Sequence, residues 1–320
     1  MWKFILRRTV VAIPQIFMLS ILVFFIASFM PGDPFSGQID PNVSPERLEE
    51  LREMYGLNDP WYQQYGRWLA NVAQGDFGDS FRFKMPVVDL IGDRFWNTAG
   101  LGILTLVFSY ILAIPMGIVS GRYNDSWLDR GIAGYTYVGF AMPSFIFGLI
   151  ALFIFGYQFR IFPTGGSVTP GLEPGTFQYI LSKIYHMLLP ALSLALLTIA
   201  NTVQYLRSEV IDTKHKEFVL TAKAKGASEN RLYNRHILRN SFLPVAAFLG
   251  YEITGVLAGA VFIERVFSFP GLGDLLISSI LQRDYSVVTA LLLLTGVLAI
   301  IGTMLSDIIL SIVDPRIRIR

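Results

Sequence analysis

Six long apolar blocks are the feature that most constrains the fold of this 320-residue chain. Each block holds about 19 to 27 residues, and at about 1.5 Å per residue a helix of that length crosses about 30 Å of hydrocarbon. The blocks cover residues 10–30, 98–120, 131–155, 187–205, 242–263 and 287–313. Because a segment in lipid must satisfy its backbone polar groups internally, each block is predicted to be a transmembrane helix.

The composition agrees with a membrane protein and excludes other classes. Only 16% of the residues are charged, whereas soluble domains carry about 25%. The 25 Phe and 5 Trp are too much apolar surface for a disordered chain. With no Cys, the chain has no disulfide framework, thiolate metal site or cysteine nucleophile. We therefore expect an all-α polytopic membrane protein with six transmembrane helices.

The basic residues predict the orientation of these helices. All 26 Lys and Arg residues lie outside the six blocks. With the N-terminus inside, the inner segments are 1–9, 121–130, 207–240 and 314–320. They hold 16 of the basic residues in about half as many positions as the outer segments, which is the positive-inside pattern. Both termini are therefore predicted to be cytoplasmic.

The blocks also divide the chain into regions. Residues 1–30 comprise a cytoplasmic N-terminus and the first helix, which ends at Met30-Pro31 without an Ala-x-Ala cleavage site and is predicted to be retained. Residues 31–97 are predicted to form a helical extracytoplasmic insertion. Residues 98–313 form a five-helix core with a cytoplasmic loop at 207–240, and residues 314–320 form a cytoplasmic tail.

The insertion contains signals for two helices. Ser44-Pro45-Glu46 is typical of a helix start, with a capping hydroxyl, a proline in the first turn and an acid near the positive end of the dipole. A second amphipathic helix from about Pro60 carries an aromatic stripe that includes Trp61 and Trp68. The stripe is typical of a core or an interfacial anchor. The acidic balance of the insertion also suits docking of a soluble partner.

The cytoplasmic loop at 207–240 contains a segment of small residues between helical patterns. Ala222 and Gly226 are four residues apart and so lie on one helical face, where their lack of bulk permits close approach to another protein. Arg231, Arg235 and Arg239 follow at four-residue spacing, which is typical of positive charge against anionic headgroups. The stripe is short and tied to a membrane, so we expect no nucleic-acid partner.

Acidic residues within or next to the blocks are candidates for a pathway through the bilayer. Glu252 and Asp307 lie inside blocks, where an ionisable group is costly and is expected to face a pathway or a partner subunit. The outer loop at 264–273 contains Glu264 and the turn Pro270-Gly271 beside apolar residues. This loop fits either a partly re-entrant cap over a pathway or an ordinary connection.

Several short motifs together resemble one family, the permease subunits of ABC importers for dipeptides and oligopeptides and, in some members, nickel. The resemblance covers essentially the whole chain. The motifs are Pro31-Gly32-Asp33-Pro34, Tyr55-Gly56-Leu57, Gly75-Asp76-Phe77-Gly78-Asp79-Ser80, Arg94-x-x-Asn97-Thr98, Met142-Pro143-Ser144-Phe145, Phe162-Pro163-Thr164-Gly165-Gly166, the segment from Glu264 to Gly273, and Asp314-Pro315-Arg316.

This resemblance implies a type I ABC importer permease fold in a bacterial cytoplasmic membrane. It implies a second homologous permease subunit, two ATPase subunits that bind ATP-Mg, and an extracytoplasmic peptide-binding lipoprotein. The ATPase-coupling segment would then comprise Thr221, Ala222, Lys223, Ala224, Lys225 and Gly226. The general importer pattern Glu-Ala-Ala-x-x-x-Gly is incomplete, because Leu220 and Thr221 stand at its first two positions. Peptide permeases share this variant, which leaves Glu217 doubtful as the acid of the motif.

The expected function is transport of oligopeptides or dipeptides by a subunit that is not itself an enzyme and holds no cofactor. The sequence contains no Gly-x-x-x-x-Gly-Lys-Ser/Thr loop, so ATP is expected on the partner subunits. His215 is followed by Lys216-Glu217 without a second His four residues on, which disfavours an intramembrane metallohydrolase. A nickel-complex importer of the same family and a self-sufficient secondary transporter remain alternatives.

Overall fold

The computed structural model describes residues 2–29, 50, 53, 58–242, 245, 249–250, 252–255 and 260–313. Regular secondary structure in these ranges is helical. The helices are α1 Trp2–Ser28, α3 Trp61–Ala73, α4 Val87–Arg122, α5 Trp127–Ala141, α6 Ser144–Ala151, the π-helix η1 Leu152–Gln158, α7 Phe177–Lys214, α8 Glu217–Ala224, α9 Glu229–Arg231, the π-helix η2 Leu232–Ile237, α10 Leu238–Ser241, α12 Val261–Val266, α13 Leu272–Leu281 and α14 Tyr285–Val313.

Four of these helices, α1, α4, α7 and α14, are long and apolar enough to cross a membrane. They contain the predicted blocks at 10–30, 98–120, 187–205 and 287–313 or nearly all of their residues. The predicted block at 131–155 is a bent pair, because α5 and the continuous α6–η1 segment meet at 106°. The block at 242–263 is described only in part, so the described residues contain four spans, or five if the bent pair is one.

The bend in this pair has a local cause. Met142 has an extended backbone, and Pro143 stands at the N-cap of α6. Proline disfavours the helical conformation in the residue before it and lacks the amide hydrogen that a continuous helix would need. By contrast, Pro14, Pro115 and Pro190 lie within unbroken helices.

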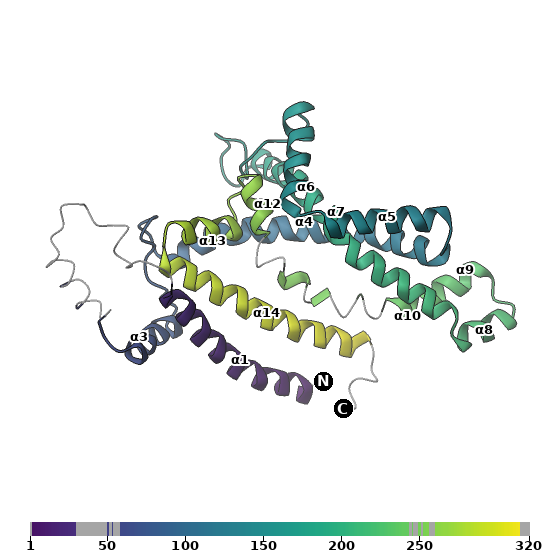
Figure 1. Ribbon diagram of the computed structural model, residues 1–320, viewed down its shortest axis with the longest axis horizontal. Helices are drawn as coiled ribbons and strands as arrows, with labels where there is room; N and C mark the ends of the chain where they lie inside the picture. Colours follow the sequence, from purple (N-terminus) through teal and green to yellow (C-terminus); the bar gives the residue numbers. More distant parts are fainter. Residues whose placement is uncertain are drawn as a thin grey trace.

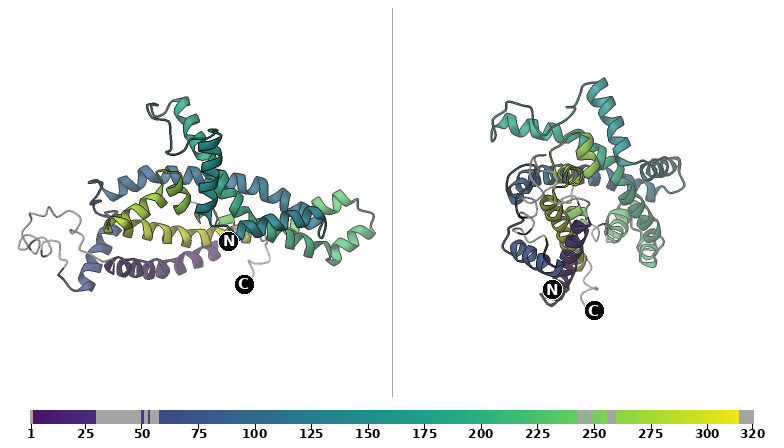
Figure 2. Two further views of the ribbon diagram at one scale, coloured as in Figure 1. Left: turned by 45° about the horizontal axis from the view of Figure 1, so that its top comes forward. Right: turned by 60° about the vertical axis from the view of Figure 1, so that its left-hand side comes forward.

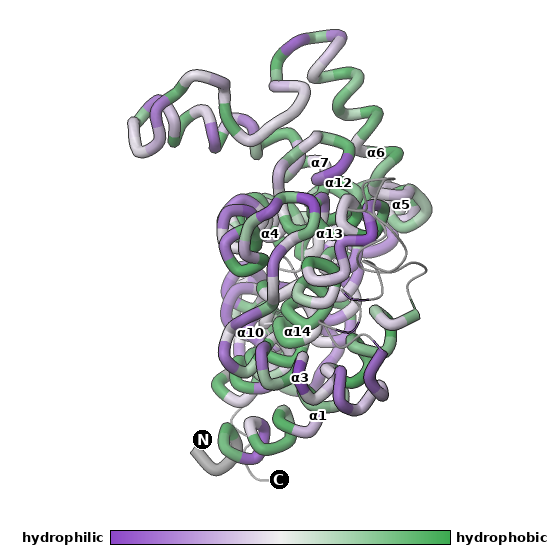
Figure 3. The backbone as a smooth tube through the Cα atoms, turned by 90° about the vertical axis from the view of Figure 1, so that its left-hand side faces the viewer, coloured by the Kyte–Doolittle hydropathy of each residue, from purple (hydrophilic) through white to green (hydrophobic). Residues whose placement is uncertain are grey.

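The spans pack in two groups. Figure 1 shows α4, α5 and α7 side by side, with α14 and then α1 beneath them, and α6 projecting away from the bundle. The two further views in Figure 2 retain this arrangement, with α8 and α9 at one end of the molecule and α3 at the other. The hydropathy colouring in Figure 3 shows apolar residues along α14 and α6.

Two glycines bring α4 and α7 into close contact. A Cβ atom on Gly117 would lie 2.9 Å from Cβ of Leu206, and one on Gly121 would lie 2.6 Å from Cβ of Val210. The Gly117-x-x-x-Gly121 pair therefore permits a close helix crossing, as its spacing indicates. A second pair with the same spacing is Gly255-x-x-x-Gly259: a Cβ atom on Gly255 would meet none of the described residues within 4 Å, and Gly259 lies outside the described residues.

The described part of the insertion is fastened to the first span by aromatic rings. Tyr65 and Trp68 of α3 pack against Phe24 of α1, the first edge to face and the second tilted, at centroid distances of 5.4 and 5.9 Å. The Tyr65 hydroxyl also hydrogen-bonds to the Ser20 hydroxyl at 2.8 Å. The aromatic stripe is thus a packing surface in part, while the helix predicted to begin near Ser44 lies outside the described residues.

Candidate functional site

A cavity of about 540 Å³ lies between α4 and α7. Thr98, Leu101, Thr105, Ser109 and Tyr110 line it from α4, and Leu194, Thr198, Asn201, Thr202 and Tyr205 line it from α7. The α7 polar residues recur at three- and four-residue spacing, so they lie on one face of that helix. Further lining comes from Val245, Glu252, Gly255 and Ala260.

Hydroxyl groups give this wall its polar character. The hydroxyl of Thr105 donates to the carbonyl of Leu101 at 2.9 Å, and that of Thr198 donates to the carbonyl of Ala195 at 3.2 Å. Ser109 and Thr198 also bond to each other across the two helices at 3.1 Å. Hydroxyls satisfied by the protein in this way still have lone pairs that accept from a passing molecule. The wall can therefore hydrogen-bond a polar ligand without presenting many fixed charges.

Glu252 is the single carboxylate among the described residues that line the cavity. The Tyr110 hydroxyl of α4 donates to Oε2 of Glu252 at 2.5 Å. This contact orients the carboxylate and links the 252–255 segment to α4. The position in the cavity wall agrees with the predicted placement of Glu252 beside a pathway, and its role there stays a prediction.

Asp307, the second predicted pathway acid, lies elsewhere. Its Oδ2 is 3.0 Å from the guanidinium of Arg8, in an ion pair between α14 and α1. Asp307 is not among the lining residues of the cavity. In this structure its charge is compensated by a basic residue from the first span.

Glu264 is fully buried and fastens the outer loop to α4. Its Oε2 accepts from the backbone amides of Gly273 at 2.7 Å and Asp274 at 3.0 Å, which belong to the first turn of α13. The Thr98 hydroxyl donates to Oε1 at 2.8 Å and in turn accepts from the amide of Leu272 at 2.8 Å. The amides at a helix start have no partner within the helix, so Glu264 and Thr98 together cap α13.

Pro270 and Gly271 support the same arrangement. The carbonyl of Pro270 accepts from the Asn97 side-chain amide at 2.9 Å, and a Cβ atom on Gly271 would lie 2.4 Å from the Glu264 carboxyl carbon. Glycine at 271 therefore leaves the space that the carboxylate occupies. Of the three loop residues predicted as pathway candidates, none lines the cavity, although Glu264 contacts its lining residue Thr98.

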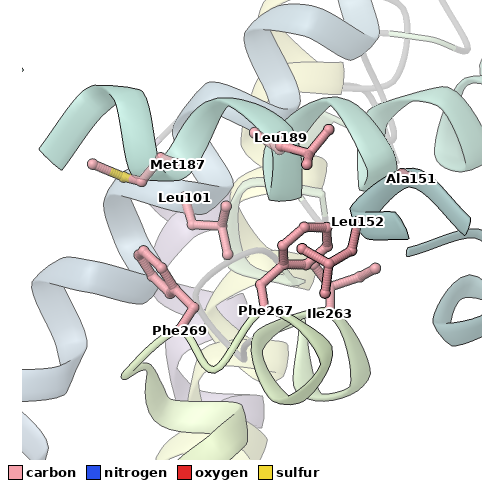
Figure 4. Close-up of a cluster of buried hydrophobic side chains, with 9 residues drawn as sticks. Leu101, Ala151, Leu152, Met187, Leu189, Ile263, Phe267 and Phe269 are labelled. Carbon is pink, nitrogen blue, oxygen red and sulfur yellow. The ribbon is translucent and has the colours of Figure 1, made fainter. Parts of the chain in front are cut away.

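An apolar cluster adjoins the cavity next to this loop. Phe267 and Phe269 are buried and pack with Leu101 of α4 and Ile263 of α12, as Figure 4 shows. Leu101 belongs both to the cluster and to the cavity wall. The loop that Glu264 holds is therefore in contact with the cavity wall through this cluster.

The predicted coupling segment, Thr221 to Gly226, forms the second half of α8 and its C-terminal turn. Val219 is buried beside Leu206 and Val210 of α7, and Ala222 packs against the same cluster. Phe218 and Leu220 remain exposed, Leu220 by 57%. The small side chain at 222 therefore meets the chain's own core, while a larger apolar surface of α8 faces outward.

Gly226 has a backbone reason to be glycine. Its φ is +80°, in the left-handed region, and none of the described residues lies within 4 Å of where a Cβ would be. The amide of Ala227 donates to the carbonyl of Ala222 at 3.2 Å, and that of Gly226 donates to Lys223 at 3.0 Å. These two bonds form a Schellman motif that ends α8. The prediction that Ala222 and Gly226 share a helical face for a partner therefore does not account for the small residues at these two positions.

Two features were missed from the sequence. One is the set of hydroxyls on α4 and α7, whose helical spacing was a usable signal. The other is an ion pair between Asp129 of α5 and Arg207 of α7, at 2.6 and 2.8 Å. Both residues lie in segments predicted to be cytoplasmic, where charged residues are common and do not indicate a specific ion pair.

Two family models match the chain. A model described as the binding-protein-dependent transport system inner membrane component matches residues 113–319, and one for the N-terminal part of such components matches residues 1–102. Similar proteins include the oligopeptide transport system permease protein AppB of Bacillus subtilis, 40% identical over 99% of both chains. OppB of Haemophilus influenzae, named an oligopeptide transport system permease protein, is 35% identical over 99% of this chain and 100% of its own.

Dipeptide transport system permease protein DppB of Lactococcus lactis is 34% identical over the full length of both chains. Among solved structures, an inward-facing conformation of the MetNI methionine ABC transporter matches with a TM-score of 0.56 and 13% identity. The match covers 71% of this chain and 97% of the other. At this identity the likeness concerns the fold.

Proposed function

Because the chain belongs to the family of binding-protein-dependent transport system inner membrane components, we propose that it is the permease subunit of an ATP-driven importer of oligopeptides or dipeptides. The observation that carries the proposal is the cavity between α4 and α7, which is lined by hydroxyls and lies on helices long enough to cross the membrane. The chain is a multi-pass membrane protein, and the excess of basic residues in its predicted inner segments supports a cytoplasmic position for both termini.

The cavity chemistry suits a peptide. A peptide carries amide donors and carbonyl acceptors along its length and side chains of varied character. The Thr105 and Thr198 hydroxyls already donate their protons to backbone carbonyls, so their free lone pairs can accept from the peptide's amide groups in any register. Fixed charges would hold one part of the ligand and slow its release, and Glu252 is the only carboxylate in the described lining. A mostly apolar wall with hydroxyls therefore supports passage rather than tight binding.

The partners follow from the same reasoning. We infer a second homologous permease subunit that completes the pathway, two ATPase subunits that bind ATP-Mg, and an extracytoplasmic lipoprotein that delivers the peptide. Leu220 of α8 is exposed and shares a helical face with Lys223, three residues on, whereas Phe218 is exposed on another side of the helix. An exposed apolar side chain with a basic neighbour suits a groove on an ATPase subunit. Closure of the ATPase pair on ATP would move α8 and, through α7, one wall of the cavity.

Reconstitution tests this function. The permease is purified with its co-expressed partner subunits, placed in proteoliposomes, and supplied with binding protein loaded either with a labelled oligopeptide or with a nickel complex. We expect ATP-dependent uptake of the peptide and stimulation of ATP hydrolysis by the peptide-loaded protein. Uptake of the nickel complex alone would assign the other substrate class. Peptide uptake that needs no ATPase subunit and no ATP would contradict the proposal in favour of a secondary transporter.

A further inference from the structure

Asp129 is a charged side chain that is almost fully buried, with 2% of its surface exposed. It receives the Arg207 guanidinium in a two-pronged ion pair, Nε to Oδ1 at 2.6 Å and Nη2 to Oδ2 at 2.8 Å. The Ser120 hydroxyl of α4 donates to Oδ1 at 2.5 Å, and the Asp125 amide donates to Oδ2 at 2.8 Å. The carboxylate thus accepts four hydrogen bonds from α4, α7 and the turn before α5.

Asp129 is buried, whereas 26% of the Arg207 side chain is exposed, so the ion pair is only partly removed from water. The pair also fixes the geometry between the two helices. The guanidinium is planar and presents its donors in a fixed fork, so the two-pronged contact sets both the distance and the rotation of α7 relative to α5. A single point contact would leave that rotation free.

Other contacts join the same helix ends. The ammonium of Lys214, in the last turn of α7, lies 3.4 Å from the carbonyl of Gly121 and also donates to the side chain of Asn124. Val210 packs against the bare backbone of Gly121. The ends of α4, α5 and α7 at this side of the molecule are therefore held together by both polar and close apolar contacts.

This assembly lies between the two regions that must communicate in an importer. Arg207 follows Tyr205, which lines the cavity, and precedes the end of α7 at Lys214. The next helix is α8, whose Val219 is buried in the same cluster as Leu206 and Val210. A displacement applied at α8 reaches the cavity walls through these helix ends.

We propose that Asp129 and Arg207 are positioning residues that lock the cytoplasmic ends of α4, α5 and α7 into one rigid body, so that movement of α8 is transmitted to the cavity. The inference rests on the proposed function, because it assumes that α8 receives the motion of an ATPase subunit. Without the Asp129–Arg207 ion pair, α8 moves while the cavity wall stays in place. ATP is then hydrolysed without a matching amount of peptide transported.

The test measures peptide transported per ATP hydrolysed by the reconstituted complex. The main variant combines Asp129→Asn with Arg207→Met, which leaves no unpaired buried charge but removes the fork. We expect it to assemble and to hydrolyse ATP within about twofold of the wild-type rate, while the transport ratio falls about tenfold. Arg130→Met is the matched control, because Arg130 is the exposed neighbour of Asp129, and its ratio should equal that of the wild type.

If the pair has only a structural role, a double variant that assembles would transport as much peptide per ATP as the wild type. That outcome overturns the inference. If the double variant does not assemble, Arg207→Lys decides, because it keeps the charge and loses the fork. A lowered ratio for Arg207→Lys supports the lock, and an unchanged ratio overturns it. Failure of the proposed function is distinguishable, because the wild-type complex would then move no peptide with ATP.

Discussion

At the scale of single residues, two acids near the cavity have opposite surroundings. Glu264 is surrounded by donors of the protein, whereas Glu252 has the Tyr110 hydroxyl and faces the cavity. Glu264 is fully buried and accepts three hydrogen bonds from the protein, so its role is structural. The Glu252 carboxylate lies in the cavity wall and can meet a ligand. The two acids therefore call for different measurements.

For Glu252 the measurement is transport. Glu252→Leu removes the carboxylate from the cavity wall without leaving a buried charge, so the complex should assemble normally. We expect peptide uptake to fall about tenfold, or about 1.4 kcal/mol of barrier height. Tyr110→Phe serves as the companion variant, since it keeps the ring and removes the donor that orients Glu252. Unchanged uptake by Glu252→Leu would mean that the acid is merely tolerated at a wet surface.

For Glu264 the measurement is stability. Glu264→Ala leaves the amides of Gly273 and Asp274 and the hydroxyl of Thr98 without an acceptor in a buried site, at about 1–3 kcal/mol for each such group. We expect a clear fall in the thermal unfolding temperature of the purified complex. Glu264→Gln keeps an amide oxygen as an acceptor and should cost less. Equal unfolding temperatures for Glu264→Ala and the wild type would contradict the capping role.

At the scale of elements, different residues of α8 end the helix and form its exposed surface. The left-handed residue that ends the helix is Gly226, whereas the outward surface is formed by Phe218 and Leu220. Ala222 contributes to the contact with α7. A substitution at Gly226 or Ala222 therefore changes the end of α8 or its packing, so its effect does not isolate contact with a partner. A substitution at the exposed Leu220 tests that contact directly.

This separation predicts a pattern among variants of α8. Gly226→Leu should lose peptide uptake and ATPase stimulation, because a side chain in the left-handed region costs about 1–2 kcal/mol. Gly226→Asn, which tolerates that conformation, should retain most of both. Leu220→Asp should abolish stimulation while expression stays normal, and Lys225→Ala should be milder. If Leu220→Asp keeps full stimulation and uptake, α8 does not couple the subunits.

At the scale of the whole molecule, the fold places its two ends in different roles. Figure 1 shows α3 and α13 toward one end of the molecule and α8 and α9 at the other. Glu264 caps α13, whereas the Asp129–Arg207 pair joins α5 to the part of α7 that leads to α8. The basic residues predict that the α8 end is cytoplasmic. Under the proposed function, motion driven by ATP would travel from this end toward the cavity.

Cysteine labelling tests the orientation in a chain that has no Cys of its own. Ser268 and Ser228 are both exposed and lie at opposite ends of the predicted topology. Ser268→Cys should react with an impermeant thiol reagent in intact cells, and so should Ser44→Cys in the predicted outer insertion. Ser228→Cys should react only after the membrane is opened. Labelling of Ser228→Cys from outside would overturn both the topology and the placement of α8.

The sequence by itself determined the properties that depend on neighbouring residues. Apolar length predicted α1, α4, α7 and α14 as spans, and the family resemblance is confirmed by the matched family models. The all-α class and the importer fold are likewise confirmed, whereas the count of six spans stays a prediction. Such features are readable because periodicity and segment length are local properties of the chain.

Only the tertiary structure decided which side chains meet. Arg207 pairs with Asp129 across 78 residues of sequence, and Thr98 reaches Glu264 across 166. These contacts depend on how helices cross, which is set by close packing at positions such as Gly121 rather than by any pattern around the polar residues. For that reason the capping of α13 by Glu264 could not be read from the sequence, while its place beside a pathway stays a prediction. The Asp129–Arg207 pair likewise depends on α5 and α7 lying side by side.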